Sequence, residues 1–127
     1  MLIFGTPPIL ECSSRGDKRF SAFYARIKRR GNKTIEELYQ ARKLFEGGVS
    51  GLSIKEAKGK LPVNIEDCRS YYSLLWREWF DENPELLLEL GQYNGFSDVF
   101  GQSGHACQAE EVYNIVKERL IGYGDAS

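Results

Sequence analysis

The sequence predicts an α+β protein, mostly helical, folded as a single small domain. Apolar residues recur at helical spacing through residues 34–90 and again through 107–121, which predicts about five helices. Two runs within residues 9–28, rich in apolar, aromatic and β-branched side chains, predict a short N-terminal β-hairpin. The length of 127 residues suits one domain with one modest core, so we take 1–127 as a single unit.

The hairpin is expected from residues 9–12 and 20–28, with Gly16 and Asp17 at the turn between them. The segment 91–106 is rich in glycine and is expected to be a loop, and loops of that length in small domains are often functional. A C-terminal helix over 107–121 and a tail over 122–127 complete the chain.

The helix that begins after Thr34 has the clearest start signal. Thr34 and Glu37 have the spacing of a capping box, and Gly47 with Gly48 marks the end of the segment. Ser53 and Glu56 repeat the same capping pattern. Asn64 is expected to cap a long central helix over 65–82, and Asn83 with Pro84 a shorter helix that ends near residue 90.

One side of the first helix carries Glu36, Gln40 and Lys43, with Tyr39 at their edge. One interpretation is an ordinary solvated helix face. In the other, Glu36 is a spare carboxylate, because Glu37 satisfies the cap, and the helix N-terminus keeps it ionised near neutral pH. An ionised carboxylate on a rigid helix can stabilise a positively charged transition state.

Charge is divided unevenly along the chain. Residues 1–60 hold 13 Lys and Arg against 6 Asp and Glu, or +7, and residues 61–127 hold 4 against 12, or −8. The basic half favours a phosphate-bearing ligand, but general nucleic-acid binding is not expected. The sequence has no apolar run long enough to span a bilayer, and we expect a cytoplasmic protein with no membrane association.

The cysteines and the histidine give weak signals. Cys12, Cys68, His105 and Cys107 lack the spacing of a zinc site, so no metal is expected. Nothing nearby in sequence orients His105 against Cys107 as a nucleophilic pair. There is also no P-loop or dinucleotide fingerprint, and we expect no cofactor.

The run from Thr34 to Lys43, Thr-Ile-Glu-Glu-Leu-Tyr-Gln-Ala-Arg-Lys, resembles the helix motif of the NADAR family, in which a Glu precedes an aromatic-Gln-Ala-x-Lys run. Residues 20–23 (Phe-Ser-Ala-Phe) resemble its Phe-Ser-Asn-Phe segment. Residues 82–90 resemble its Asn-Pro-Glu-Leu helix, and residues 98–101 (Asp-Val-Phe-Gly) its Asp-x-x-Trp-Gly element. These proteins are N-glycosidase-like and are linked to NAD and ADP-ribose chemistry.

The resemblance implies hydrolysis of a ribosyl C–N bond in an ADP-ribosyl or phosphoribosyl substrate. Glu36 and Asp98 would be the catalytic residues, because an oxocarbenium-like transition state needs a carboxylate beside the ribose. The expected substrate-binding residues are Lys18, Arg19, Phe20, Phe23, Tyr39, Gln40, Lys43, Phe100 and Gly101.

Two alternatives stay open at this point. A non-catalytic module would bind an ADP-ribose-like or phosphorylated ribosyl ligand in the same pocket. A protein-interaction module would use the many aromatic side chains, 2 Trp, 7 Tyr and 7 Phe, against a partner.

Overall fold

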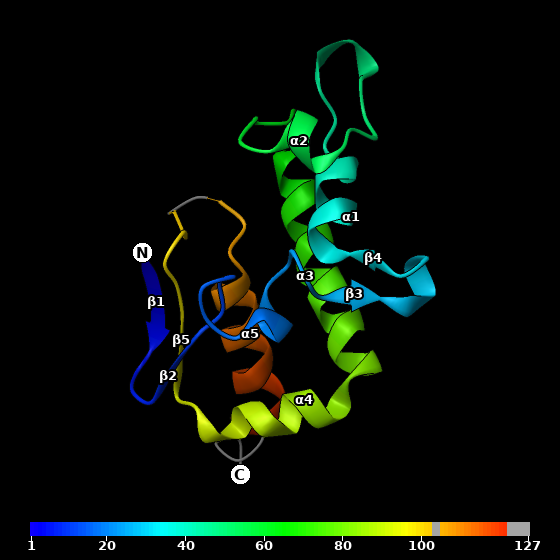
Figure 1. Cartoon of the computed structure of the whole chain (residues 1–127). Coiled ribbons are helices and arrows are strands. Elements are labelled where there is room, and N and C mark those ends of the chain that lie inside the picture. Colours follow the sequence, from blue (N-terminus) through cyan, green and yellow to red (C-terminus); the bar gives the residue numbers. More distant parts are fainter. Residues whose placement is uncertain (103–104, 122–127) are drawn as a thin grey trace.

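The computed structural model describes residues 1–102 and 105–121, so the tail expected at 122–127 lies outside the described residues. A long central helix has other helices on either side and a small sheet next to the last of them (Figure 1). The expected fold class, α+β and mostly helical, is confirmed. Within the described residues, none of the helices is both long enough and apolar enough to cross a membrane.

Five α-helices are present in the described residues, as expected. They are α1 (Ile35–Arg42), α2 (Ile54–Ala57), α3 (Ile65–Glu82), α4 (Pro84–Glu89) and α5 (Gln108–Val116). A π-helical turn, Lys117–Ile121, continues α5, and 3₁₀ turns occur at Lys18–Phe20, Lys28–Arg30, Glu46–Gly48 and Leu90–Gln92. The central helix has the bounds that the sequence predicted.

The expected pairing of residues 9–12 with 20–28 is wrong. Strand β2 (Ile9–Glu11) pairs in parallel with β5 (Gly95–Asp98), which also pairs antiparallel with β1 (Leu2–Gly5). The partner strand therefore comes from the segment 91–106 that was expected to be loop throughout. The second run, residues 20–28, is not one strand: Phe20 ends a 3₁₀ helix, Lys18–Phe20, which Asp17 caps by accepting from the Arg19 N–H, and residues 22–24 form a turn.

A separate two-stranded hairpin leads into α1. Strand β3 (Arg26–Ile27) pairs antiparallel with β4 (Lys33–Thr34), and a left-handed Gly31 and the turn before it connect them. Only the end of the predicted 20–28 strand is thus extended, and it pairs with residues further along the chain.

The core is built around α3. Its buried aromatic residues meet edge to face, with ring centroids 5.5 Å apart for Trp76 and Trp79 and 5.0 Å apart for Trp79 and Phe80. Phe20 joins this cluster at 5.8 Å from Trp79. Helices α1 and α5 lie on two sides of α3 (Figure 1) and pack against it, so residues on α1 and at the start of α5 have a rigid base.

Two predicted caps are confirmed and two are not. Thr34 with Glu37, and Ser53 with Glu56, both form complete capping boxes. Asn64 and Asn83 occupy N-cap positions, but neither side chain makes the capping bond.

The Asn64 side chain closes a long excursion of the chain instead. Its Oδ1 accepts from the Leu44 N–H at 2.8 Å, and its Nδ2 donates to the Arg42 carbonyl at 3.1 Å. The excursion 44–63 leaves the end of α1, carries α2 and returns to the start of α3 (Figure 1). Both ends are therefore fixed beside α1.

Candidate ligand cavity

A cavity of about 690 Å³ lies between α1, the end of the excursion, α3 and the segment after β5. That volume is in the usual range for small-molecule sites. It is lined by eight of the residues that the sequence assigned to the site, namely Phe23, Glu36, Tyr39, Gln40, Lys43, Asp98, Phe100 and Gly101. The two expected catalytic carboxylates, on α1 and at the end of β5, thus reach one cavity.

The column on α1 is buried, so the interpretation as a solvated face is wrong. Glu36 is 9% exposed and Gln40 is 3% exposed. The Gln40 Nε2 donates to Oε1 of Glu36 at 2.7 Å. The Gln40 Oε1 is buried and has no hydrogen-bond partner among the described residues. A ligand that donates a hydrogen bond to this oxygen would therefore satisfy it and gain binding energy.

Burial changes the expected ionisation of Glu36. Removal from water raises the pKa of its carboxyl above the ordinary value, and the Gln40 amide and the Lys58 and Lys43 ammonium groups lower it by less. The helix N-terminus was expected to keep Glu36 ionised, but the cost of burial outweighs the groups that favour its charge. A raised pKa brings the carboxyl closer to proton exchange near neutral pH.

Lys43 is held firmly and is not a mobile phosphate ligand. Its Nζ donates to the Ala57 carbonyl at 3.2 Å and to the Lys60 carbonyl at 3.0 Å, and it lies 5.5 Å from the centre of the Tyr39 ring. Burial lowers the pKa of Lys43, although the Glu36 carboxylate opposes this. The bonds of Lys43 tie α1 to the segment 57–60 that forms one wall of the cavity.

Asp98 is engaged by three donors. Its Oδ1 accepts from the Phe100 N–H at 2.9 Å, and its Oδ2 accepts from the Gln108 Nε2 at 3.2 Å and from the Cys107 thiol at 3.8 Å. Burial raises the pKa of the Asp98 carboxyl in spite of these donors. The bond to Phe100 shows that Asp98 also shapes the turn after β5, which is a common use of this residue.

The rim of the cavity is aromatic and basic. The Lys58 Nζ lies 4.9 Å from the ring centre of Phe23, and the Arg15 guanidinium 5.2 Å from that of Phe100. The sequence reasoning missed Lys58, Lys60 and Arg69, which also line the cavity. The positive net charge of residues 1–60 was the signal for Lys58 and Lys60, whereas Arg69 lies in the acidic half of the chain, residues 61–127.

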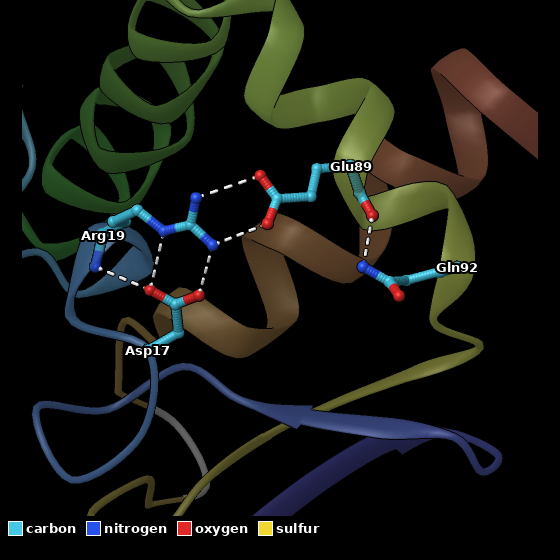
Figure 2. A network of polar contacts seen from close by, with 4 residues as sticks. All are labelled: Asp17, Arg19, Glu89 and Gln92. Carbon is cyan, nitrogen blue, oxygen red and sulfur yellow. Dashed lines mark hydrogen bonds and ion pairs between the residues drawn. The ribbon is translucent and has the colours of Figure 1, made fainter.

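Three predicted binding residues do not line the cavity. Phe20 is 1% exposed and belongs to the core. The Arg19 guanidinium donates to the carboxylates of Asp17 and Glu89, with its shortest contact to each at 2.7 Å (Figure 2). Arg19 is not among the residues that line the cavity. Lys18 lies 5.3 Å from the Tyr24 ring and outside the cavity lining.

The three cysteines are buried and unbridged. In residues 1–102 and 105–121 no group of three or more His, Cys, Asp or Glu side chains is arranged to hold a metal ion. His105 lines the cavity, and with Cys107 it also lines an adjoining hollow of about 280 Å³. Burial raises the pKa of the Cys107 thiol, which weakens it as a nucleophile.

A scan against protein-family models and a search of curated protein sequences found no match to this chain.

Proposed function

We propose that the cavity binds a phosphorylated ribosyl compound and hydrolyses its N-glycosidic C–N bond. The observation that supports this most is the convergence of Glu36 and Asp98, both buried, on one cavity with a basic rim. The residues belong to segments far apart in the chain. Acid–base cleavage of a glycosidic bond commonly uses two carboxyl groups in one cleft, of which one carries a raised pKa and acts as the acid.

In the proposed reaction a water oxygen bonds to the anomeric carbon as the bond from that carbon to nitrogen breaks. Glu36 faces the positive charge that develops on the ribose and takes a proton from the water. Where the base would otherwise leave as an anion, as adenine does, Asp98 gives it a proton; nicotinamide leaves as a neutral molecule and takes none. Lys58, Lys60 and Arg69 supply positive charge for the phosphate on the cavity wall.

The resemblance of residues 34–43 to the NADAR helix motif supports the same proposal. The motif residues Glu36, Gln40 and Lys43 all line the cavity. The motif and the cavity thus point to the same residues. Because the resemblance implies ADP-ribosyl as well as phosphoribosyl substrates, the proposal includes both.

The test is base release from N-ribosyl phosphates. Purified protein is incubated with nicotinamide mononucleotide, NAD and adenosine monophosphate, and the free base is measured by chromatography. We expect turnover of at least one compound, with about 100-fold slower turnover for Glu36→Gln. Glu85→Gln is the matched control, because Glu85 is also in the first turn of a helix but is exposed and outside the cavity. Equal rates for the wild type and Glu36→Gln would refute the catalytic role.

A binding module without catalysis is the second candidate, because the oxygens of Asp98 already accept from three donors. That arrangement favours a fixed carboxylate over one that gives up a proton. Calorimetric binding of ADP-ribose or ribose 5-phosphate, with no base release from any of the N-glycosides, would select this function. An interaction module would be favoured by a wide separation of Glu36 and Asp98, whereas both residues line the same cavity.

A further inference from the structure

A chain of three hydrogen bonds joins the backbone of Glu36 to the carboxylate of Asp98. The Glu36 N–H donates to the Ala22 carbonyl at 3.0 Å, and the Ala22 N–H donates to Oε1 of Gln108 at 2.9 Å. The Gln108 Nε2 then donates to Oδ2 of Asp98 at 3.2 Å. All four residues are buried. The connection is short, although the two carboxylates come from distant parts of the chain.

The orientation of the Gln108 amide is fixed by its partners. A backbone N–H can only donate, so the Ala22 N–H must face Oε1 of Gln108. The Nε2 group then necessarily faces Asp98. Gln108 is also the first residue of α5, so its own backbone belongs to a regular element packed on the sheet and the core. The amide therefore acts as a rigid spacer.

We propose that Gln108 is a positioning residue that sets the separation of the Glu36 and Asp98 carboxylates by holding Asp98 to the backbone of Ala22. This inference rests on the proposed function, in which both carboxylates act on one ribosyl group. A displacement of about 1 Å between reacting groups can cost about 100-fold in rate, so a fixed spacer of this kind matters for turnover.

The Gln108 amide also affects how readily the Asp98 carboxyl binds a proton, because of the other groups around Asp98. Glu11, on β2, repels a negative charge on Asp98, and the Cys12 and Cys107 thiols face the same region. The Glu11 carboxylate is itself held by the Ser97 hydroxyl at 2.7 Å and the Val99 N–H at 3.0 Å. Loss of the Gln108 N–H would leave the Phe100 N–H and the Cys107 thiol as donors to Asp98 among the described residues.

Two variants of Gln108 separate positioning from folding. Gln108→Glu keeps an oxygen for the Ala22 N–H but places a carboxylate opposite Asp98, and Gln108→Met removes both bonds. Gln92→Met is the control, because Gln92 is exposed and its Nε2 donates only to the Glu89 carbonyl in the described residues (Figure 2). Each protein is assayed across pH for base release from adenosine monophosphate, whose adenine needs a proton to leave, and the Asp98 carboxyl is titrated by carbon NMR.

For Gln108→Glu we expect kcat to fall about 10- to 100-fold while KM stays within about twofold of the wild type. The fall of kcat on the alkaline side of its pH profile should move to higher pH, because Asp98 holds its proton to higher pH. In both Gln108 variants the NMR midpoint of Asp98 should rise by about one pH unit. A purely structural role would change stability but would leave the pH profile in place.

The inference is overturned if Gln108→Glu keeps the wild-type kcat and the wild-type titration of Asp98. If the wild type releases no base from any N-glycoside, the proposed function fails separately, and the titration decides alone. An upward midpoint in both Gln108 variants then supports the spacer, and an unchanged midpoint refutes it.

Discussion

Replacement of Glu36 by glutamine should stabilise the protein at neutral pH while it removes the proposed activity. Glutamine has the shape of glutamate and keeps an oxygen for the Gln40 amide, now 2.7 Å from Glu36. The bond loses about 1 kcal/mol when its acceptor is no longer charged. Relief of the buried charge is worth more than this, because the net effect of the surroundings is to raise the Glu36 pKa. We expect a net gain of about 1 kcal/mol in the free energy of unfolding.

The pH dependence distinguishes this explanation from others. Folding raises the pKa of Glu36 above its ordinary value of 4.5, so the folded state holds the proton more tightly than the unfolded state. The stability that Glu36 contributes is fully present below 4.5 and is lost as the pH rises through the raised pKa. The advantage of Glu36→Gln should therefore be small in acid and should grow toward neutral pH.

Urea denaturation followed by tryptophan fluorescence, at pH 4, 5, 6, 7 and 8, measures the difference between the two proteins. Glu85→Gln should show no comparable growth, because Glu85 is exposed. A Glu36→Gln protein that is less stable than the wild type at pH 8, or a difference that does not vary with pH, would refute the reasoning.

Three further predictions concern residues whose roles the structure revised. Arg19→Met should lower the free energy of unfolding, more at low salt than at high salt, because the guanidinium forms ion pairs with Asp17 and Glu89. The affinity for ribose 5-phosphate, measured by calorimetry, should not change, and a tenfold loss of affinity would contradict this. Phe20→Leu should cost about 1–2 kcal/mol in urea denaturation, since Phe20 is core, with no change in KM. Lys43→Met should speed amide hydrogen exchange in residues 57–60 and weaken ribose 5-phosphate binding about tenfold, because both carbonyl contacts are lost; protection equal to the wild type would exclude the anchoring role.

Local signals were enough to predict that five helices form and where they begin, although α1 ends at Arg42, before Gly47 and Gly48. The capping boxes at Thr34 and Ser53 depend on residues three positions apart, and the bounds of α3 follow from the periodicity of its own apolar residues. The sheet could not be predicted in the same way. Its central strand, Gly95–Asp98, is short and lies within the glycine-rich segment 91–106, and both of its partners come from the first eleven residues.

In the site too, residues that depend on local spacing could be predicted, and residues that depend on distant contacts could not. The column on α1 could be predicted because Glu36, Gln40 and Lys43 share one face of a helix, but its burial depends on the excursion 44–63 folding back over it. Lys58 and Gln108 were missed for this reason. Their places in the cavity wall are set by contacts with distant residues, and a single sequence does not show such contacts.

The position of β5 between β1 and β2 has a consequence for biosynthesis. Strands β1 and β2 are synthesised first, yet the strand that pairs with both of them, β5, is complete only when residue 98 has been added. Helix α1 is synthesised well before that moment, and Asp98 cannot enter the sheet until β5 has been made. An affinity tag fused directly before Leu2 would sit beside the Asp98 end of β5, where Leu2 is the register partner of Asp98, so a tag at that end is the one to avoid in an activity assay.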